Sequence, residues 1–437
     1  MSEAIVTSFG RVRRSRAEVL PLYFTCDAAI PIGRKVLPYG LGRSYGDACL
    51  NEGGVLLATR GLDRFVELDL EHELVSCESG VSLGEVLALA VPRGFFLPVV
   101  PGTKEVTVGG AIAHDVHGKN HHLCGTFGSQ VESLLLMRSN GERLVCSRTE
   151  NPQLFAATVG GLGLTGLILQ ATLRLRRITS AQIEVETLAL PDLEAFFALS
   201  RDSDPHFEYT VAWIDSRARG PKLGRGLLYR GNHVEERGPL KAPPLRPSFT
   251  FPCELPFSLL NRASLPLMNA LHYARSRLEV GKRRVDLGPF FFPLDGLGRW
   301  NLVYGRRGFF QFQTLVPPDR APEAIRAILS TVAASGQGSF LTVLKNFGSR
   351  ASPGLLSFPR PGTTLALDFA NRGETTRRLF GDLHALVREA GGRIYPAKDA
   401  LMPPEQFQAQ HADVLADFRS CMDPAFSSSF WRRVTGD

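Results

Sequence analysis

The chain has 437 residues, a length that exceeds one ordinary hydrophobic core and predicts two domains. Hydrophobic residues make up 44% and charged residues 21%, which excludes a disordered, collagen-like or coiled-coil protein. The formal net charge of +7 is mild, and no basic block typical of a nucleic-acid-binding arm occurs, so we expect no nucleic-acid partner.

Residues 30–180 combine short strand and helix patterns with many glycines. Apolar and acidic residues alternate over 66–70, which predicts a strand. Ser82 and Glu85 form the pattern of a capping box and predict the start of a helix. Asn140-Gly141 lies between two apolar runs and predicts a hairpin with a two-residue turn.

Later patterns extend this mixed organisation. Asn151-Pro152 predicts an N-cap followed by the first residue of a helix, and the apolar run from 167 to 175 predicts a strand. Apolar and polar residues alternate again over 181–230, with Trp213 in a run of strand type. Helix patterns return at 321–335 and 374–390.

The segment between these regions has an unusual composition. Residues 233–260 are rich in proline and predict a long loop, functional or mobile. Residues 261–293 combine Leu, Met and Phe with basic residues that include Arg275, Arg277, Lys282, Arg283 and Arg284. A segment of such a composition can lie on a membrane surface. The reading that we favour is a helix of the cap domain with a solvated basic side.

The seven cysteines are scattered and no CxxC occurs, which predicts reduced thiols without a disulfide framework or a zinc site. Residues 1–20 lack the apolar core of a signal peptide, and no run of 18 apolar residues is long enough to span a membrane. We therefore expect a cytoplasmic protein.

Three glycine-rich segments indicate an anion-binding site: residues 38–47, 101–128 and 159–166. Closely spaced glycines allow backbone N–H groups to approach a group such as a pyrophosphate. No GxxxxGK[ST] motif occurs, which argues against a P-loop hydrolase. The GxGxxG at 161–166 follows a helix and opens a strand, the reverse of the Rossmann order.

Five motifs carry a family resemblance: GRSYGD at 42–47, HDVHGKNHH at 114–122, PKLGR at 221–225, GFFQFQ at 308–313 and YPAKD at 395–399. In this order they resemble the PCMH-type (vanillyl-alcohol-oxidase-type) FAD-binding oxidoreductases, and within them a subgroup that acts on polyprenyl-phosphate-linked pentoses. The motifs run from about residue 40 to 400, so the resemblance covers most of the chain.

The resemblance implies an α+β, two-domain fold. An FAD-binding domain at 1–180 would be completed by 393–437, and residues 181–392 would form a substrate domain on an antiparallel sheet, with a mobile region at 233–290. Many relatives bond the flavin covalently through a histidine of the first loop. Ser44 and Tyr45 stand there in this chain, so we expect FAD to be bound without a covalent bond.

The resemblance also implies residue roles. Lys398, His117 and Tyr45 form the catalytic set. Lys398 would place a cation beside N1 and O2 of the flavin, and His117 is a natural proton acceptor near neutral pH. The histidines at 114, 117, 121 and 122 could instead suggest a metal, but they lack the acidic or cysteine partners of a closed zinc site, so we expect none.

Cofactor binding is assigned to the glycine loops and their neighbours: Gly40, Gly42, Arg43, Ser44, Tyr45, Gly46, Pro101, Gly102, Thr103, Gly109, Gly110, His117, Gly118, Asn120, Gly125, Gly163, Gly166 and Lys398. Substrate contacts are assigned to Lys119, Trp213, Gln311, Gln313 and Thr364. The two glutamines alternate with phenylalanines, so on a strand both amides face one side.

The chain departs from the subgroup's pattern at three pocket positions. Thr364 and Ala366 stand where the pattern has an Asn and a Cys, and Phe291 stands where it has a Tyr. The loss of an amide and a hydroxyl changes which sugar groups can be paired, so we expect altered sugar recognition.

These observations predict FAD-dependent oxidation of the C2 hydroxyl of a polyprenyl-phosphate-linked pentose, by hydride transfer to flavin N5. The keto sugar would pass to an NADH-dependent short-chain reductase, and the enzyme would contact the inner membrane peripherally. One alternative is a soluble alditol or aldonolactone oxidase of the same superfamily. An alternative of another class is a non-catalytic flavin-binding scaffold subunit.

Overall fold

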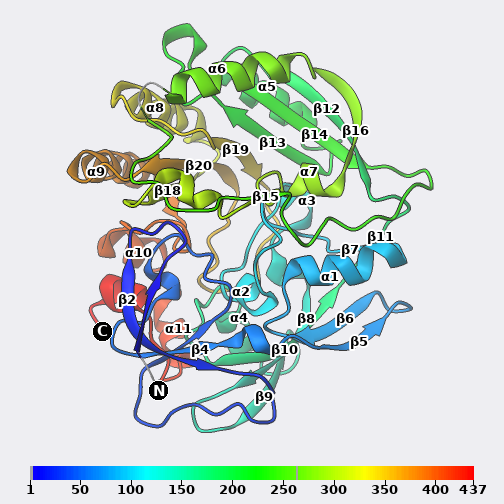
Figure 1. Cartoon of the computed structure of the whole chain (residues 1–437), viewed down its shortest axis with the longest axis vertical. Helices are drawn as coiled ribbons and strands as arrows, with labels where there is room; N and C mark the ends of the chain where they lie inside the picture. The colour runs from blue at the N-terminus through cyan, green and yellow to red at the C-terminus, as the bar shows by residue number, and fades with distance from the viewer. Residues whose placement is uncertain (1–2, 262–263) are drawn as a thin grey trace.

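The computed structural model describes residues 3–261 and 264–437. Its lower half in Figure 1 contains two sheets. A mixed four-stranded sheet has the order β1 (Glu3–Thr7), β2 (Arg14–Pro21), β4 (Val55–Ala58), β3 (Val36–Tyr39). An antiparallel five-stranded sheet has the order β5 (Phe65–Asp69), β6 (Leu74–Glu78), β10 (Leu167–Arg174), β8 (Val131–Met137), β9 (Arg143–Ser147).

Short helices connect these strands: α1 (Leu83–Ala90), α2 (Val108–Ala113), α3 (His121–Cys124) and α4 (Pro152–Thr158). Helices α2 and α3 lie within the second glycine-rich segment. The predicted capping box opens α1, because Ser82 Oγ accepts from Glu85 N at 3.2 Å and Glu85 Oε2 accepts from Ser82 N at 2.7 Å. The strands predicted at 66–70 and 167–175 are confirmed as β5 and β10.

Two local predictions need correction. The hairpin between β8 and β9 forms, but Arg138 N still pairs with Glu142 O at 2.9 Å, so the turn has three residues. Gly141 adopts φ +85°, the left-handed conformation that such a turn needs at its last position. Pro152 opens α4 as predicted, but the Asn151 side chain donates to Val145 O at 2.7 Å and caps no helical N–H.

An antiparallel eight-stranded sheet dominates the upper half of Figure 1. Its order is β16 (Gly281–Asp286), β12 (Gln182–Leu190), β14 (Gly226–His233), β13 (Tyr209–Ile214), β19 (Val343–Phe347), β20 (Gly362–Ala370), β18 (Phe309–Val316), β21 (Arg393–Ile394). Three helices cover one face: α5 (Leu193–Ser203), α8 (Ala321–Ala334) and α9 (Glu374–Glu389). The last two confirm the helices predicted near 321 and 374.

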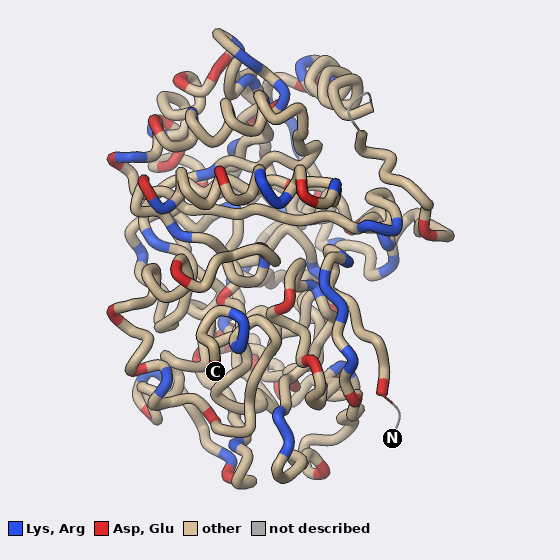
Figure 2. Tube along the Cα trace, turned by 90° about the vertical axis from the view of Figure 1, so that its left-hand side faces the viewer, with Lys and Arg blue, Asp and Glu red and all other residues tan. Residues whose placement is uncertain are grey.

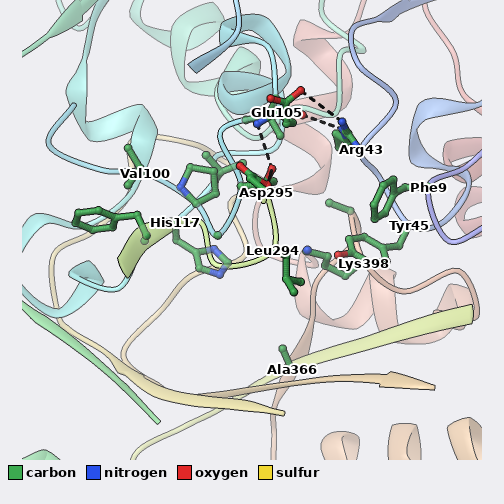
Figure 3. A pocket seen from close by; sticks show the side chains of 18 of the residues that line it. Phe9, Arg43, Tyr45, Val100, Glu105, His117, Leu294, Asp295, Ala366 and Lys398 are labelled. Carbon is green, nitrogen blue, oxygen red and sulfur yellow. Dashed lines mark hydrogen bonds and ion pairs between the residues drawn. The ribbon is translucent and has the colours of Figure 1, made fainter. Parts of the chain in front are cut away.

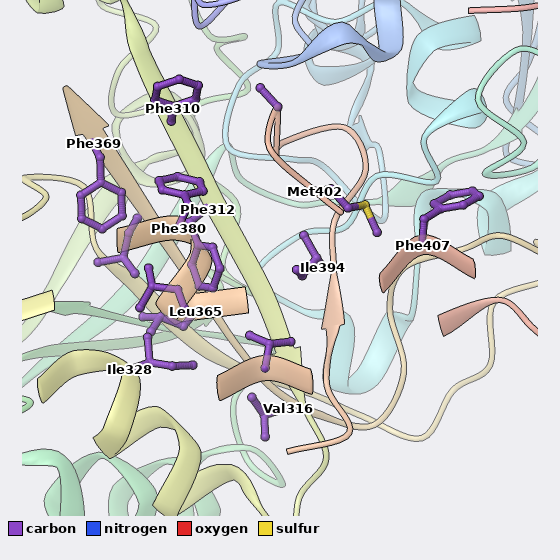
Figure 4. Close-up of a cluster of buried hydrophobic side chains, with 14 of the residues drawn as sticks. Phe310, Phe312, Val316, Ile328, Leu365, Phe369, Phe380, Ile394, Met402 and Phe407 are labelled. Carbon is purple, nitrogen blue, oxygen red and sulfur yellow. The ribbon is translucent and has the colours of Figure 1, made fainter. Parts of the chain in front are cut away.

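The core beneath these helices explains how the sheet is oriented. Phe310 and Phe312 of β18 pack against Ile328 of α8 and Phe380 of α9 (Figure 4). Side chains of a strand alternate between its faces, so the intervening glutamines of β18 point to the opposite side. The face without helices is therefore free to line a site.

Residues 234–261 form a long irregular stretch whose one strand, β15 (Phe249–Thr250), pairs with β17 (Leu297–Gly298). It leads to α6 (Ser264–Arg277), β16 and α7 (Leu287–Phe291). A further two-stranded sheet joins β7 (Phe95–Phe96) to β11 (Arg176–Arg177). None of the described helices is both long and apolar enough to cross a membrane.

The C-terminal helices α10 (Pro404–Gln410), α11 (Leu415–Cys421) and α12 (Ser429–Thr435) return to the N-terminal strands (Figure 1). Val36 of β3 forms a parallel bridge with Phe426. Arg433 of α12 forms a double ion pair with Asp47, with Nε–Oδ2 at 2.7 Å and Nη2–Oδ1 at 2.9 Å. The α+β architecture is confirmed, and the domain boundaries at 180 and 393 stay a prediction.

Candidate functional site

A cavity of about 1030 Å³ lies between the three glycine-rich segments and the open face of the eight-stranded sheet. Every residue predicted for the site lines this cavity, apart from Gly46, Asn120 and Gly125. The tertiary structure thus brings together motifs from opposite ends of the chain, such as those of Gly40 and Lys398, because the sheet and the glycine loops meet at this place.

Gly46, Asn120 and Gly125 do not line the cavity but belong to the glycine-rich segments that form its wall. A Cβ on Gly46 would lie 2.8 Å from Ala400 Cα, so only glycine allows these backbones to approach. Asn120 donates to Pro98 O at 2.8 Å. Gly125 has φ +73°. We propose that they support the FAD loops without touching the cofactor.

The cavity walls fit an extended dinucleotide. A Cβ on Gly102 would meet no atom within 4 Å and would project into free space at the cavity wall. Gly163 has φ +75°, a conformation that keeps the third glycine loop close beneath the cavity. Buried Ser79 Oγ and His114 Nδ1 have no hydrogen-bond partner in the described structure, as expected where polar ligand atoms belong.

Lys398 lies on a turn that is held tightly. Asp399, next to it, accepts from Leu401 N at 2.7 Å and is bonded to His384 Nε2 of α9 at 2.8 Å. The Lys398 ammonium lies 4.1 Å from the centre of the Tyr45 ring (Figure 3). Burial lowers the pKa of Lys398, and the negative charge of Asp368 opposes that shift.

Asp368, on β20, was not identified from the sequence. It pairs with Gln311 across the β18–β20 ladder and accepts from Gln311 Nε2 at 2.5 Å. Its Oδ2 and the Gln311 Oε1 have no hydrogen-bond partner among the described residues. Burial raises the pKa of Asp368 to about 7, and the hydrogen bond from Gln311 and the charge of Lys398 oppose this rise.

His117 is a neutral imidazole held by the sheet. Gln313 Nε2 lies 3.0 Å from His117 Nε2 and 3.3 Å from Thr364 Oγ1, whose own proton goes to Thr314 O at 2.8 Å. Gln313 therefore donates to both groups, which leaves the ring proton of His117 on Nδ1. Burial lowers the pKa of His117 well below its usual range.

Two further lysines reach the cavity wall. Lys119 Nζ donates to Phe290 O at 2.7 Å, and burial lowers its pKa to about 8. Lys345 of β19 donates to Gly118 O at 2.8 Å, and burial together with the charges of Lys119 and Lys398 lowers its pKa to about 7. The sequence analysis missed Lys345, although it is one of only eight lysines in the chain.

The first glycine loop carries Ser44 at the position where the family resemblance implies a flavin-bonding histidine in many members. Ser44 Oγ lies 3.3 Å from His114 Nε2, so an imidazole from the second loop occupies this neighbourhood. Burial lowers the pKa of His114 to about 4. Both side chains line the cavity.

Asp295 connects the 281–300 segment to the second glycine loop. Its carboxylate accepts from Thr103 Oγ1 at 2.6 Å and from Lys104 N at 2.8 Å. On the same side, Arg43 Nε donates to Glu105 O at 3.0 Å. Among the described residues, no group of three or more His, Cys, Asp or Glu side chains could hold a metal ion.

The remaining predicted contacts lie on the sheet side of the cavity. Trp213 of β13 donates from Nε1 to Phe340 O at 2.8 Å and is 7% exposed. Trp213 is therefore fixed in the wall rather than free to move. Ala366 lies at the floor of the cavity (Figure 3). It is on β20, the strand that pairs with β18 on one side and β19 on the other.

Comparison with known proteins agrees with the family resemblance of the sequence motifs. The model of the FAD-binding-domain family matches residues 16–147. Decaprenylphosphoryl-β-D-ribose oxidase of Mycolicibacterium smegmatis is 38% identical over 92% of this chain and 89% of its own length. L-gulonolactone oxidase of Mus musculus is 32% identical over 38% of this chain and 36% of its own length.

D-arabinono-1,4-lactone oxidase of Kluyveromyces lactis is 27% identical over 49% of this chain and 40% of its own length. The match to the ribose oxidase thus spans both halves of the molecule, whereas the matches to the lactone oxidases are partial. FAD is the cofactor that this family binds. The chain therefore belongs to the PCMH-type FAD-dependent oxidoreductases, the family that includes decaprenylphosphoryl-β-D-ribose oxidase.

Proposed function

We propose that this enzyme oxidises the C2 hydroxyl of a polyprenyl-phosphate-linked pentose to a ketone, as the first half of an epimerisation. The observation that carries the proposal is a single cavity that joins the glycine loops to Lys398, His117, Lys119 and Lys345. The full-length similarity to a decaprenylphosphoryl-ribose oxidase supports the same substrate class.

Bound FAD supplies the hydride acceptor of the reaction. The glycine loops and Thr103 would hold it, and we propose that they do so without a covalent bond because Ser44 replaces the bonding histidine. Lys398 supplies a fixed positive charge that would favour the reduced form of the ring. Precipitation with acid should release the yellow colour into the supernatant; colour retained in the protein pellet would contradict non-covalent binding.

We assign His117 the role of the base that accepts the proton of the C2 hydroxyl of the substrate. Its buried imidazole is neutral at physiological pH, so it can accept a proton without first losing one. In the structure His117 Nε2 already accepts from Gln313, so this hydrogen bond has to open before Nε2 can take the hydroxyl proton; Thr364 contributes to the orientation of that amide. Tyr45 excludes water from the Lys398 ammonium by packing against it.

We assign Lys119 and Lys345 the role of binding the phosphate and the sugar hydroxyls of the substrate. Burial favours the loss of their protons, and an anionic ligand would reverse this by stabilising the charged ammonium groups. Thr364 and Ala366 replace an Asn and a Cys at the cavity floor, so we propose that the pentose is held with a different set of hydrogen bonds from that in the subgroup's pattern.

The test is reduction of the purified flavoprotein in a stopped-flow spectrometer. A polyprenyl-phosphoryl ribose should bleach the flavin band near about 450 nm, whereas free alditols and aldonolactones should not. Equal rates with free alditols would favour the soluble-oxidase alternative, and no bleaching with any sugar would favour a scaffold subunit. Addition of an NADH-dependent short-chain reductase should convert the keto product to the epimer.

A further inference from the structure

The cavity continues well beyond the residues to which the proposed reaction is assigned. Lys398, His117 and the two glutamines of β18 lie at one end, whereas the lining extends across β20, β19, β13, β14 and β12 as far as β16. Neighbouring strands lie about 4.8 Å apart, so the distance across the sheet from β18 to β16 is roughly 29 Å. The ring of a pentose occupies only a small part of this width, which leaves room for another portion of the ligand.

The floor of the cavity changes from polar to apolar along one row of paired residues. Gln313 pairs with Ala366, Ala366 with Val343, and Val343 with Trp213, across β18, β20, β19 and β13. Residues that are directly opposite each other point to the same face of a sheet. Beyond Gln313 the one polar atom of this row is Trp213 Nε1, and it already donates to Phe340 O at 2.8 Å. The row therefore offers a ligand mainly hydrocarbon beyond β18.

The strands on the far side extend this apolar floor. Val211 pairs with Tyr229 across β13 and β14, and Val285 of β16 also lines the cavity. Val211 and Val285 are only half-buried, as is Val343 of the row above. Because these side chains line the cavity, the surface that packing leaves uncovered can contact a ligand. We call this part of the cavity, over β13, β14 and β16, the apolar end.

Helix α6 forms the roof of the apolar end and is held in place by the PKLGR motif. Arg225, the last residue of the motif, donates from Nη2 to Asp215 Oδ2 at 2.5 Å, and Asp215 Oδ1 accepts from Asn269 Nδ2 of α6 at 2.9 Å. The ring of His272 on α6 lies 4.5 Å from that of Trp213 on the floor. Buried polar contacts thus join the roof to the floor and give the space between them a defined shape.

The charged side chains of the apolar end lie near the C-terminal end of α6. Arg275, Glu279 and Arg283 line the cavity there, and Arg283 forms an ion pair with Glu279. Figure 2 shows α6 at the upper right, with basic residues near its C-terminal end. The charge of this end is therefore at its edge, and the floor beneath α6 stays apolar.

Two cations stand between the polar and the apolar end. Lys345 lies on β19, next to the strand of Trp213, and pairs with Thr364. The backbone of Lys119 reaches the same place, because Lys119 O accepts from Thr210 N of β13 at 3.1 Å. Along the sheet the groups therefore follow in the order polar, cationic and apolar.

We propose that the apolar end binds the first isoprenoid units of a polyprenyl-phosphate substrate, and that five side chains form its floor: Val211, Trp213, Tyr229, Val285 and Val343. The order of the groups along the sheet is the order of sugar, phosphate and lipid in such a substrate. Transfer of an isoprenoid chain from water to this floor is favourable in proportion to the apolar area that is buried. The inference rests on the proposed function, from which it takes the substrate class.

The experiment is calorimetric titration of the holoprotein with dimethylallyl, geranyl and farnesyl phosphate, a series in which each member adds an isoprene unit and none carries a sugar. The affinity should rise at least about tenfold from dimethylallyl to geranyl phosphate, because more hydrocarbon is buried. Farnesyl phosphate should also quench tryptophan fluorescence, and Trp213→Phe should remove most of this signal. Equal affinities along the series would overturn the proposal.

Val211→Thr/Val343→Thr keeps the shape of the floor and adds two hydroxyl groups to it. This variant should bind farnesyl phosphate roughly tenfold more weakly, because a hydroxyl group buried against hydrocarbon lacks a hydrogen-bond partner. Its affinity for inorganic phosphate should not change. A second variant, Val211→Phe, fills part of the apolar end and should abolish any gain in affinity from geranyl to farnesyl phosphate.

The matched control is Val66→Thr/Val145→Thr, the same change at two valines that are 55% and 42% exposed on the N-terminal half. This control should bind the whole series like the unaltered protein. An unchanged affinity for farnesyl phosphate in Val211→Thr/Val343→Thr, or an equal loss in the control, contradicts the assignment of the apolar end.

Flavin reduction separates this inference from the proposed function. If ribose linked to geranyl and to farnesyl phosphate reduces the flavin with the same KM, the isoprenoid site is overturned and the proposed function stands. If the isoprenyl phosphates bind with the expected dependence on chain length but no lipid-linked pentose reduces the flavin, the proposed function is overturned and the isoprenoid site stands.

Discussion

At the scale of single residues, Lys398 and Asp368 are buried groups of opposite charge, and each favours the charged form of the other. Burial favours the neutral form of each group, and each charge stabilises the other. The carboxylate of Asp368 is otherwise supported by Gln311 alone among the described residues, and its Oδ2 has no hydrogen-bond partner. We therefore expect Asp368 to influence the reaction through the charge of Lys398.

Replacing Asp368 with Asn should shift the pH profile of flavin reduction. Loss of the negative charge lowers the pKa of Lys398 further, so the ammonium is lost at a lower pH. If the ammonium is the required form, the basic limb of the profile should move down by about one to two pH units. Asp382→Asn, an exposed change on α9, should leave the profile in place. If the basic limb does not move in Asp368→Asn, Asp368 does not control the pKa of Lys398, and the prediction is contradicted.

His121 offers a second test at this scale. It is 1% exposed, its ring lies 4.2 Å from that of Phe347, and neither ring nitrogen has a partner in the described structure. His121→Phe should raise the free energy of unfolding by about 1 kcal/mol, because it removes an unpaired buried polar group without loss of volume. Chemical denaturation would measure this, and a lower stability would show that a ligand or water satisfies the ring.

At the scale of elements, α12 holds the first glycine loop from behind. Arg433 of α12 donates two hydrogen bonds to the carboxylate of Asp47, which is only 4% exposed. Arg433→Met should cost about 3 kcal/mol of stability because it leaves a buried carboxylate unpaired, and it should weaken FAD binding by loosening the loop.

Denaturant titration and cofactor titration of the apoprotein would measure both effects. The matched control is Arg419→Met on α11, whose partner Asp437 is about half exposed, so its loss should cost less than about 1 kcal/mol. An equal effect of the two substitutions would contradict the role given to α12.

At the scale of the whole molecule, buried histidines predict instability in acid. Burial lowers the pKa of His114 and His233 to about 4 and of His121 to about 3, and it depresses those of His117 and His411 well below the usual value of a histidine. The unfolded chain binds protons below about pH 6.5 and the folded chain does not, so stability is complete above that pH and falls below it. Buried Asp115 and Asp368 act in the opposite direction, because their pKa values are raised.

The melting temperature should therefore fall between pH 7.5 and pH 5, by an amount that corresponds to about 1–2 kcal/mol for each buried histidine. His121→Phe should reduce this pH dependence, and His206→Gln, which alters an exposed histidine, should not. A melting temperature that stays constant over this range would contradict the neutral state of the buried imidazoles. Scanning calorimetry measures the effect.

The sequence by itself determined the local elements and the chemistry of the motifs. Alternation along β18 separated its glutamines from its phenylalanines, and the capping box located the start of α1, because both depend on neighbours within a few residues. The motifs also identified the FAD family. The hairpin length and the orientation of Asn151 could not be read, since bonds to neighbouring backbone decide them.

Only the tertiary structure decided which groups share the cavity. Asp368, Lys345 and Asp295 have no local pattern of their own, and they become part of the site because β18, β19, β20 and the 281–300 segment converge on the glycine loops. The apolar end of the cavity was equally hidden, because alternation reveals which residues of a strand share a face but not which strands lie side by side. Burial and long-range charge arise from packing, and a linear sequence does not state which residues are packed together.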